Sequence, residues 1–274
     1  MDEVDDTVRR AFLDELRLLG AMPPGPRTER VLAAFGRVPR ARFAGPGPWT
    51  LISPLHFDRT VRTPDDDPRH LYHCVLIAVD GAKGINIGEP SMWARALARA
   101  DLPPDGRVLQ VGAGSGYYSA ILAALCGSVL GFEIEPALAR RAQAATAGSD
   151  DIRIRSGSAV DDLREADGPF DAIVAFAGVT HPPRAWLDRL SPGGRMLLPV
   201  TGSRGWGAMA ILAPTDDGVL EGRTLGGVGF YDCAGARDAR MAARLDDLFS
   251  DRGRLDDWQF RAVGRAGRWR LEGL

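Results

Sequence analysis

The sequence predicts an α/β protein with a doubly wound, mostly parallel sheet, preceded by N-terminal helices and followed by a C-terminal extension. From residue 90 onward, short apolar strands alternate with helical segments, and crossover helices of this kind favour parallel pairing. A glycine-rich turn joins the strand expected at 107–111 to the next helix, as in nucleotide-binding α/β folds. The chain has 274 residues, 45% of them hydrophobic, which is enough for one large core with additions.

Hydrophobic periodicity, glycine stops and proline starts place the individual elements. A helical and irregular cap, residues 1–89, is expected to contain helices at 5–19 and 27–35, ended by Gly20 and Gly36, an irregular segment at 39–69 and a strand at 72–79. A core, residues 90–213, is expected to contain helices at 90–100, 115–125, 137–147 and after Pro183, and strands at 107–111, 128–133, 152–155, 171–176 and 195–199. An extension packed on the core, residues 214–274, follows the strand at 208–212 and is expected to contain a strand at 226–231 and a helix at 238–249.

Composition narrows the class of protein. A net charge of −2 calls for neither nucleic acid nor a membrane surface as partner, and no apolar run approaches the roughly 18 residues of a membrane span. The acidic N-terminus lacks the basic and apolar regions of a signal peptide. Cys74, Cys126 and Cys233 are scattered, without metal-ligand spacing. We therefore expect a cytoplasmic protein that binds no metal, nucleic acid or membrane.

The run VLQVGAGSGYYS, residues 108–119, is the most informative segment. Glycine allows a sharp turn and close backbone approach to a ligand, and the next helix points free N–H groups toward it. A dinucleotide fingerprint would need glycine at the sixth position, where the chain has Tyr117. The pattern resembles motif I of S-adenosylmethionine-dependent methyltransferases, although a tight turn without a ligand is the alternative. The candidate cofactor-binding residues in this run are Gly112, Ala113, Gly114, Ser115, Gly116 and Tyr117.

Three later strand ends supply further candidates for the cofactor site. Glu133 ends the strand at 128–133, where a carboxylate can accept from both ribose hydroxyls, and Ile134 follows it. The alternatives are that Glu133 is a solvated carboxylate or that the nearby Glu135 binds the ribose instead. At Gly157 and Ser158, many methyltransferases carry Gly-Asp, so the serine leaves adenine to backbone and stacking contacts. Ala177 follows the strand at 171–176, whose carboxyl end is expected to face the ligand.

An ordered series of segments resembles one family, the protein-L-isoaspartate O-methyltransferases, over roughly residues 28 to 213. Besides the glycine run and Glu133, the matching segments are VLAAFGRVPRARF at 31–43, GINIGEP at 84–90, FDAI at 170–173 and PGGRMLLPV at 192–200. The resemblance implies a class I methyltransferase fold, S-adenosylmethionine as the cofactor and a carboxylate on a protein or peptide as the methyl acceptor.

The chain departs from this family at the acceptor motif. Gly88 stands where the family places a serine hydroxyl against the substrate carboxylate, and Asn86 and Glu89 replace the flanking Thr and Gln. Asn86 and Glu89 are therefore candidate acceptor-site residues. Glu89 either contacts the acceptor or caps the helix that begins at Pro90.

The expected chemistry explains why no catalytic dyad is visible in the sequence. An ionised carboxylate is already a nucleophile at neutral pH, so methyl transfer needs alignment and exclusion of water more than a general base. A hydroxyl acceptor would need a base, and His181, just past the strand at 171–176, is the histidine placed for that role. The alternative is a loop histidine that orders the following Pro-Pro turn.

We predict an S-adenosylmethionine-dependent methyltransferase that acts on a carboxylate of a protein or peptide. One alternative keeps the cofactor and changes the acceptor to a biosynthetic peptide or a small natural product, which Gly88 and the C-terminal extension favour. Another is a non-catalytic cofactor-binding partner. An NAD-dependent oxidoreductase is disfavoured by Tyr117.

Overall fold

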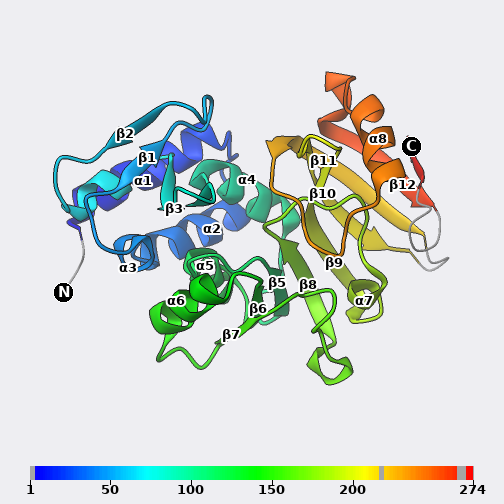
Figure 1. The fold of residues 1–274 in the computed structure, drawn as a ribbon, viewed down its shortest axis with the longest axis horizontal. Helices are drawn as coiled ribbons and strands as arrows, with labels where there is room; N and C mark the ends of the chain where they lie inside the picture. The colour runs from blue at the N-terminus through cyan, green and yellow to red at the C-terminus, as the bar shows by residue number, and fades with distance from the viewer. Residues whose placement is uncertain (1–3, 216–218, 264–269, 274) are drawn as a thin grey trace. The chain divides into compact units, whose positions relative to one another are not determined.

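The computed structural model describes residues 4–215, 219–263 and 270–273, and the chain forms two compact units (Figure 1). The first unit comprises Met1–Asp101, Ala113–Leu125 and Ala137–Ile154, and the second comprises Leu102–Gly112, Cys126–Pro136 and Arg155–Leu274. Residues 1–3 of the acidic N-terminus lie outside the described residues. The predicted domain limits at residues 89 and 213 stay a prediction.

Six helices and a small sheet build the described part of the first unit. Its elements are α1 (Asp6–Leu19), α2 (Pro26–Arg37), α3 (Ala41–Ala44), β1 (Thr50–Ile52), β2 (Thr60–Arg62), the 3₁₀ turn η1 (Pro68–Leu71), β3 (Leu76–Asp80), β4 (Ile85–Ile87), α4 (Pro90–Ala100), α5 (Tyr117–Leu125) and α6 (Pro136–Thr146). Asp5 caps α1 by accepting from the N–H groups of Thr7 and Val8. The helices that the sequence predicts in this unit begin and end close to their predicted limits, with one exception.

The exception is α2, which continues through Gly36 to Arg37 instead of ending there. A Cβ atom at Gly36 would lie 3.3 Å from Cδ1 of Leu13 on α1. The glycine therefore allows close packing of two helices and does not serve as a C-cap. The prediction that Gly36 ends this helix was wrong.

Two strands of a small antiparallel sheet, β1 and β2, lie in the segment expected to be irregular. Its strand order is β2-β1-β3-β4, and three of its strands are only three residues long. Such strands are too short to show a periodic pattern in the sequence. The strand expected at 72–79 begins at Leu76, because residues 71–75 instead turn around the buried side chain of Arg40.

The second unit is built on a large sheet. Its elements are β5 (Arg107–Val111), β6 (Ser128–Glu133), β7 (Ile152–Ser156), η2 (Glu165–Asp167), β8 (Phe170–Ala175), α7 (Arg184–Leu187), β9 (Leu190–Thr201), β10 (Trp206–Pro214), β11 (Leu220–Gly229), α8 (Ala239–Leu248), η3 (Arg252–Arg254), β12 (Asp256–Val263) and β13 (Arg270–Gly273). The strand order is β13-β12-β11-β10-β9-β8-β5-β6-β7, with the last residues of β7 in this unit.

Strand direction divides this sheet into two halves. β5 pairs in parallel with β6 and β8, and β8 pairs in parallel with β9. β9 to β13 pair antiparallel in series. Strand order reverses at β5, where the chain moves outward to β6 and β7 and then returns through β8; this is the switch point of a doubly wound sheet. The predicted fold class is confirmed.

The core of this unit extends from the parallel strands into the C-terminal segment. Leu109, Ile173 and Met196 on the strands, Leu245 on α8 and Phe260 on β12 are all buried in one hydrophobic cluster. β11 begins at Leu220, earlier than the predicted 226, and β12 and β13 are strands that the sequence did not predict. Within the described residues, no helix is long and apolar enough to cross a membrane, and no group of three potential metal ligands occurs.

Candidate functional site

The glycine loop has the backbone that its sequence predicts. Gly112, Gly114 and Gly116 have φ angles of 80°, 58° and 90°, which side chains other than glycine rarely adopt. A Cβ atom on Gly114 would meet no atom within 4 Å, so its Cα faces open space. Gly112 N–H donates to Phe132 O at 2.8 Å, which fixes the start of the loop against the end of β6. The loop thus presents its backbone at the carboxyl end of β5.

The other residues of this run are mostly buried. Ala113 packs with Ala142, and Ser115 is buried. The ring of Tyr117 lies edge-on to Phe43, 5.8 Å between centroids, and the guanidinium of Arg40 lies over it. Tyr117 is therefore a core residue at the start of α5, while the glycines provide the open part of the loop.

The end of β6 carries a buried carboxylate. Glu133 is 6% exposed, and its Oε1 accepts from Glu135 N–H at 3.0 Å. Gly157 N–H donates to Glu133 O at 2.9 Å, so the end of β7 is bonded to the same residue. Ile134 is 54% exposed and offers an apolar surface beside this carboxylate. Glu133, Ile134 and Gly157 thus meet at one edge of the second unit.

Ser158 has a local structural role, and Asp162 is a carboxylate that sequence reasoning missed. Ser158 Oγ accepts from the N–H groups of Val160 and Asp161, both at 3.1 Å. Asp162 Oδ2 accepts from Ser158 N–H at 2.7 Å, and a Cβ atom on Gly157 would collide with it. Asp162 lies four residues after Ser158, outside the three-residue spacing of a capping box, so no sequence pattern indicated it.

In the first unit, the acceptor motif leads from β4 into α4. Asn86 lies in β4 and its Nδ2 donates to Gly84 O at 3.1 Å. Glu89 is the N-cap of α4, and its two carboxylate oxygens accept from Ser91 and Met92 N–H at 2.7 and 2.8 Å. Of the two interpretations of Glu89, the structure thus shows the helix cap directly.

Gly88 is enclosed by aromatic side chains. A Cβ atom there would lie 2.9 Å from Nε1 of Trp93, and Tyr118 OH donates to Gly88 O at 2.8 Å. The Trp93 and Tyr118 rings are tilted against each other at 5.5 Å. Burial raises the pKa of Tyr118 well above its ordinary value, with a smaller contribution from Tyr117, so the phenol stays a donor. The aromatic side chains around residue 88 therefore leave little room for a side chain at this position.

His181 lies in the loop after β8, at the carboxyl end of the strands of the second unit. Ala177 and Gly178 lead from β8 into this loop, and Val179 bridges to Val200 of β9. His181 is half-buried, and its Nδ1 lies 2.9 Å from Thr180 Oγ1. Burial lowers the pKa of His181; Asp238 opposes this shift and Arg237 adds to it. The imidazole is accordingly neutral at pH 7.

These features fit S-adenosylmethionine chemically. The positive φ angles and the open space at Gly114 suit a ligand that lies against backbone, and the buried Glu133 carboxylate suits a pair of ribose hydroxyls. The exposed side chain of Ile134 suits a flat base.

Comparisons with known proteins agree with this fit. The family described as protein-L-isoaspartate(D-aspartate) O-methyltransferase (PCMT) matches residues 24–237. A protein-L-isoaspartate O-methyltransferase of Gloeobacter violaceus is 32% identical over 74% of this chain and 89% of its own length. One of Anaeromyxobacter dehalogenans is 34% identical over 72% of this chain and 85% of its own.

Solved structures share the fold. A protein-L-isoaspartate O-methyltransferase superposes with a TM-score of 0.66 and 18% identity, covering 97% of this chain and 87% of the other. A Plasmodium falciparum protein assigned the same activity, crystallised with S-adenosyl-L-homocysteine, gives a TM-score of 0.60 at 19% identity and covers 82% of this chain and 97% of its own. At these identities the likeness concerns the fold alone.

Proposed function

The chain belongs to the protein-L-isoaspartate(D-aspartate) O-methyltransferase family, and from that premise we propose that it methylates the free carboxylate of isoaspartyl residues in proteins or peptides. S-adenosylmethionine is the cofactor and supplies a methyl group on a positively charged sulfur. The family match favours neither the natural-product alternative nor the non-catalytic one. We further propose a cytoplasmic location, which is supported by Cys74, Cys126 and Cys233, because none of these described cysteines forms a disulfide.

The glycine loop is the observation that carries this proposal. Its three positive φ angles, at alternate residues, occur just after β5, where a doubly wound sheet binds its ligand. We propose that its backbone from Gly112 to Gly116 binds the cofactor and that Glu133 accepts hydrogen bonds from the ribose. The other residues that we predict to lie at the cofactor site are Tyr117, Ile134, Gly157, Ser158 and Ala177.

In the proposed reaction, the residues of the chain position the acceptor carboxylate and the cofactor. A carboxylate has a pKa near 4 in water and is ionised at pH 7, so this reaction needs no general base. We propose that His181 contacts the acceptor through its imidazole and that Asn86 lies on the acceptor side. The cap made by Glu89 holds the start of α4, and with it the backbone at Gly88, in place.

Label transfer tests the proposed activity. The purified chain would be incubated with methyl-labelled S-adenosylmethionine and either an isoaspartyl peptide or the same peptide containing ordinary aspartate. We expect methyl ester formation on the isoaspartyl peptide alone. Transfer to neither peptide, but to small molecules from a cell extract, would instead support the natural-product alternative.

Calorimetry tests the cofactor site separately from turnover. Glu133→Ala removes the proposed ribose acceptor and is expected to weaken S-adenosylmethionine binding by about tenfold or more, the loss of one to two good hydrogen bonds. Glu135→Ala, two residues away, is the matched control and should leave the affinity close to that of the wild type. Equal affinity in both variants would refute the assignment of Glu133.

A further inference from the structure

The loop that carries His181 is held between two segments far apart in the sequence. On one side, Val179 N–H donates to Pro199 O and Thr201 N–H donates to Val179 O, both at 2.9 Å. On the other side, Gly178 N–H donates to Tyr231 O at 2.7 Å and Thr180 N–H donates to Ala236 O at 3.0 Å. Residues 178–180 therefore lie as a short added strand between β9 and the segment 231–238.

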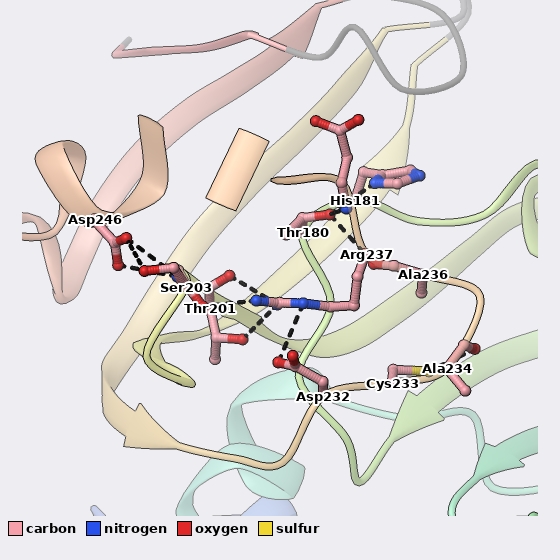
Figure 2. Close-up of polar contacts among 12 residues, drawn as sticks. Thr180, His181, Thr201, Ser203, Asp232, Cys233, Ala234, Ala236, Arg237 and Asp246 are labelled. Carbon is pink, nitrogen blue, oxygen red and sulfur yellow. Dashed lines mark hydrogen bonds and ion pairs between the residues drawn. The ribbon is translucent and has the colours of Figure 1, made fainter. Parts of the chain in front are cut away.

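Arg237 ties these two neighbours together (Figure 2). Its Nη1 donates to both the carbonyl and the hydroxyl oxygen of Thr201 at 2.9 Å, and its Nη2 donates to Gly202 O at 2.6 Å. Its Nε lies 3.1 Å from Oδ1 of Asp232. The guanidinium thus joins the end of β9 to the segment that begins at Tyr231, which fixes the space in which Thr180 lies.

The Thr180 hydroxyl lies within hydrogen-bond distance of three groups. Asp238 N–H donates to it at 2.9 Å. His181 Nδ1 lies at 2.9 Å and Ala236 O at 3.2 Å. A hydroxyl has one proton to donate and accepts at its lone pairs, so it cannot donate to His181 and to Ala236 at the same time.

Distance and competition decide where that proton goes. Ala236 O has a donor without the hydroxyl, because it accepts the Thr180 N–H at 3.0 Å, and of the two contacts of the hydroxyl, the one with Ala236 O is the longer. Nδ1 is closer, and a neutral imidazole has one bare nitrogen that needs a donor. We propose that Thr180 is a positioning residue that donates its hydroxyl proton to Nδ1 of His181 and thereby holds the imidazole proton on Nε2.

This tautomer matches a carboxylate acceptor. With the proton on Nε2, the outer edge of the ring donates a hydrogen bond, which suits an anion. The opposite tautomer would present a bare nitrogen, which suits removal of a proton from a hydroxyl or amine. This step rests on the proposed function, since it assigns to His181 the orientation of the acceptor carboxylate and not general-base catalysis.

The tautomer can be observed directly and without turnover. Long-range ¹H–¹⁵N correlation spectra at about pH 7.5, where the neutral form prevails, distinguish the two ring nitrogens. The chain has only four histidines, so the His181 signals can be assigned by their loss in His181→Gln. We expect the wild type to have its proton on Nε2. A wild-type spectrum with the proton on Nδ1 would overturn the proposal, whatever the variants do.

Variants at Thr180 test the cause of the tautomer. Thr180→Val removes the hydroxyl and is expected to give a mixture of tautomers, whereas Thr180→Ser retains the donor and should preserve the wild-type spectrum. Thr224→Val is the matched control, because Thr224 is buried in the same unit and its hydroxyl accepts one backbone N–H, that of Trp258. An unchanged His181 spectrum in Thr180→Val would contradict the assignment.

Kinetics separate the tautomer from the acceptor role. Thr180→Val is expected to raise KM for the isoaspartyl peptide about threefold to tenfold, the value of one hydrogen bond, with unchanged affinity for S-adenosylmethionine. Thr180→Ser should restore KM. A wild-type KM in His181→Gln would refute the acceptor role of His181 in the proposed function, while the spectra decide the tautomer independently.

Discussion

Two arginines, one in each unit, hold backbone segments in place by donating hydrogen bonds to carbonyl oxygens, but their surroundings differ. Arg40 in the first unit is 0% exposed, donates to Leu71 O and His73 O at 2.8 and 2.7 Å, and lies 5.4 Å from the ring centroids of Phe12 and Tyr117. Arg237 in the second unit has an 18% exposed side chain and also pairs with a carboxylate. The first arginine is part of a core, whereas the second is part of the frame around a loop. Their removal should therefore have different consequences.

The largest expected effect is on the fold of the first unit. Arg40→Ala leaves two buried carbonyl oxygens without their donor, each worth about 1.5–3 kcal/mol, so we expect the free energy of unfolding to fall by about 3–5 kcal/mol. Chemical denaturation measures the loss. Arg42→Ala is the control, because Arg42 is exposed two residues later and should change stability by about 0.5 kcal/mol or less. Similar losses in both variants would show that the burial of Arg40 has little energetic importance.

Arg237→Ala is expected to weaken binding of the acceptor and to destabilise the fold less than Arg40→Ala does. Loss of the partly exposed guanidinium should lower the free energy of unfolding by about 2 kcal/mol. It should also raise KM for the isoaspartyl peptide several-fold, because the frame around Thr180 loosens. Arg240→Ala, on an exposed position of α8, is the control for both measurements. If KM stays constant while stability falls, Arg237 is structural only, and the contrast with Arg40 disappears.

A smaller effect is expected at Gly88, where space is the limiting factor. Gly88→Ser places a Cβ atom 2.9 Å from Nε1 of Trp93, and overpacking of this kind costs about 1–2 kcal/mol. Gly81→Ser is the matched control, since a Cβ atom there meets nothing within 4 Å. Thermal or urea unfolding of the two variants compares them. Equal stability would mean that Trp93 moves aside freely.

The smallest expected effect is the pH dependence contributed by His181. Its pKa is lowered in the folded protein by burial, with Arg237 adding to the shift and Asp238 opposing it. Below the ordinary pKa of 6.5, the unfolded chain takes up a proton that the folded chain does not, so stability falls as pH decreases from that value. His181→Gln should lose this part of the acid dependence. Urea midpoints measured above and below pH 6.5 test this, and identical pH slopes in both proteins would contradict it.

The parallel half of the fold could be predicted because local signals and long-range packing agree there. The glycines of the loop, the proline that starts α4 and the apolar runs of β5, β6 and β8 all indicate the observed elements. The small sheet of the first unit could not be predicted, because β1 and β2 are short and neither alternates in burial: β1 is partly buried along its length and β2 is exposed. Gly36 was misinterpreted because close helix packing and a helix end both call for glycine.

At the site, the sequence predicted the backbone features better than the side-chain bonds. The positions of Gly112 and Glu133 follow from where a strand ends. Asp162 and Arg237 were missed, because a side chain that bonds to a backbone group leaves no periodic pattern, and the partners of Arg237 lie up to 36 residues away. The choice between the two interpretations of Glu89 likewise required its measured distances to Ser91 and Met92.

The turn between β9 and β10 has a consequence for the order in which the chain is assembled. Ser203 N–H and Oγ donate to the carboxylate of Asp246 on α8, 43 residues later, and a Cβ atom on Gly202 would collide with this carboxylate. Asp246 lies beyond the segment that matches the family. During translation, β9 and β10 are synthesised before α8, so the hydrogen bonds between their turn and Asp246 form only after α8 has emerged from the ribosome. The segment that follows the family match thus stabilises the turn of a hairpin that is synthesised before it.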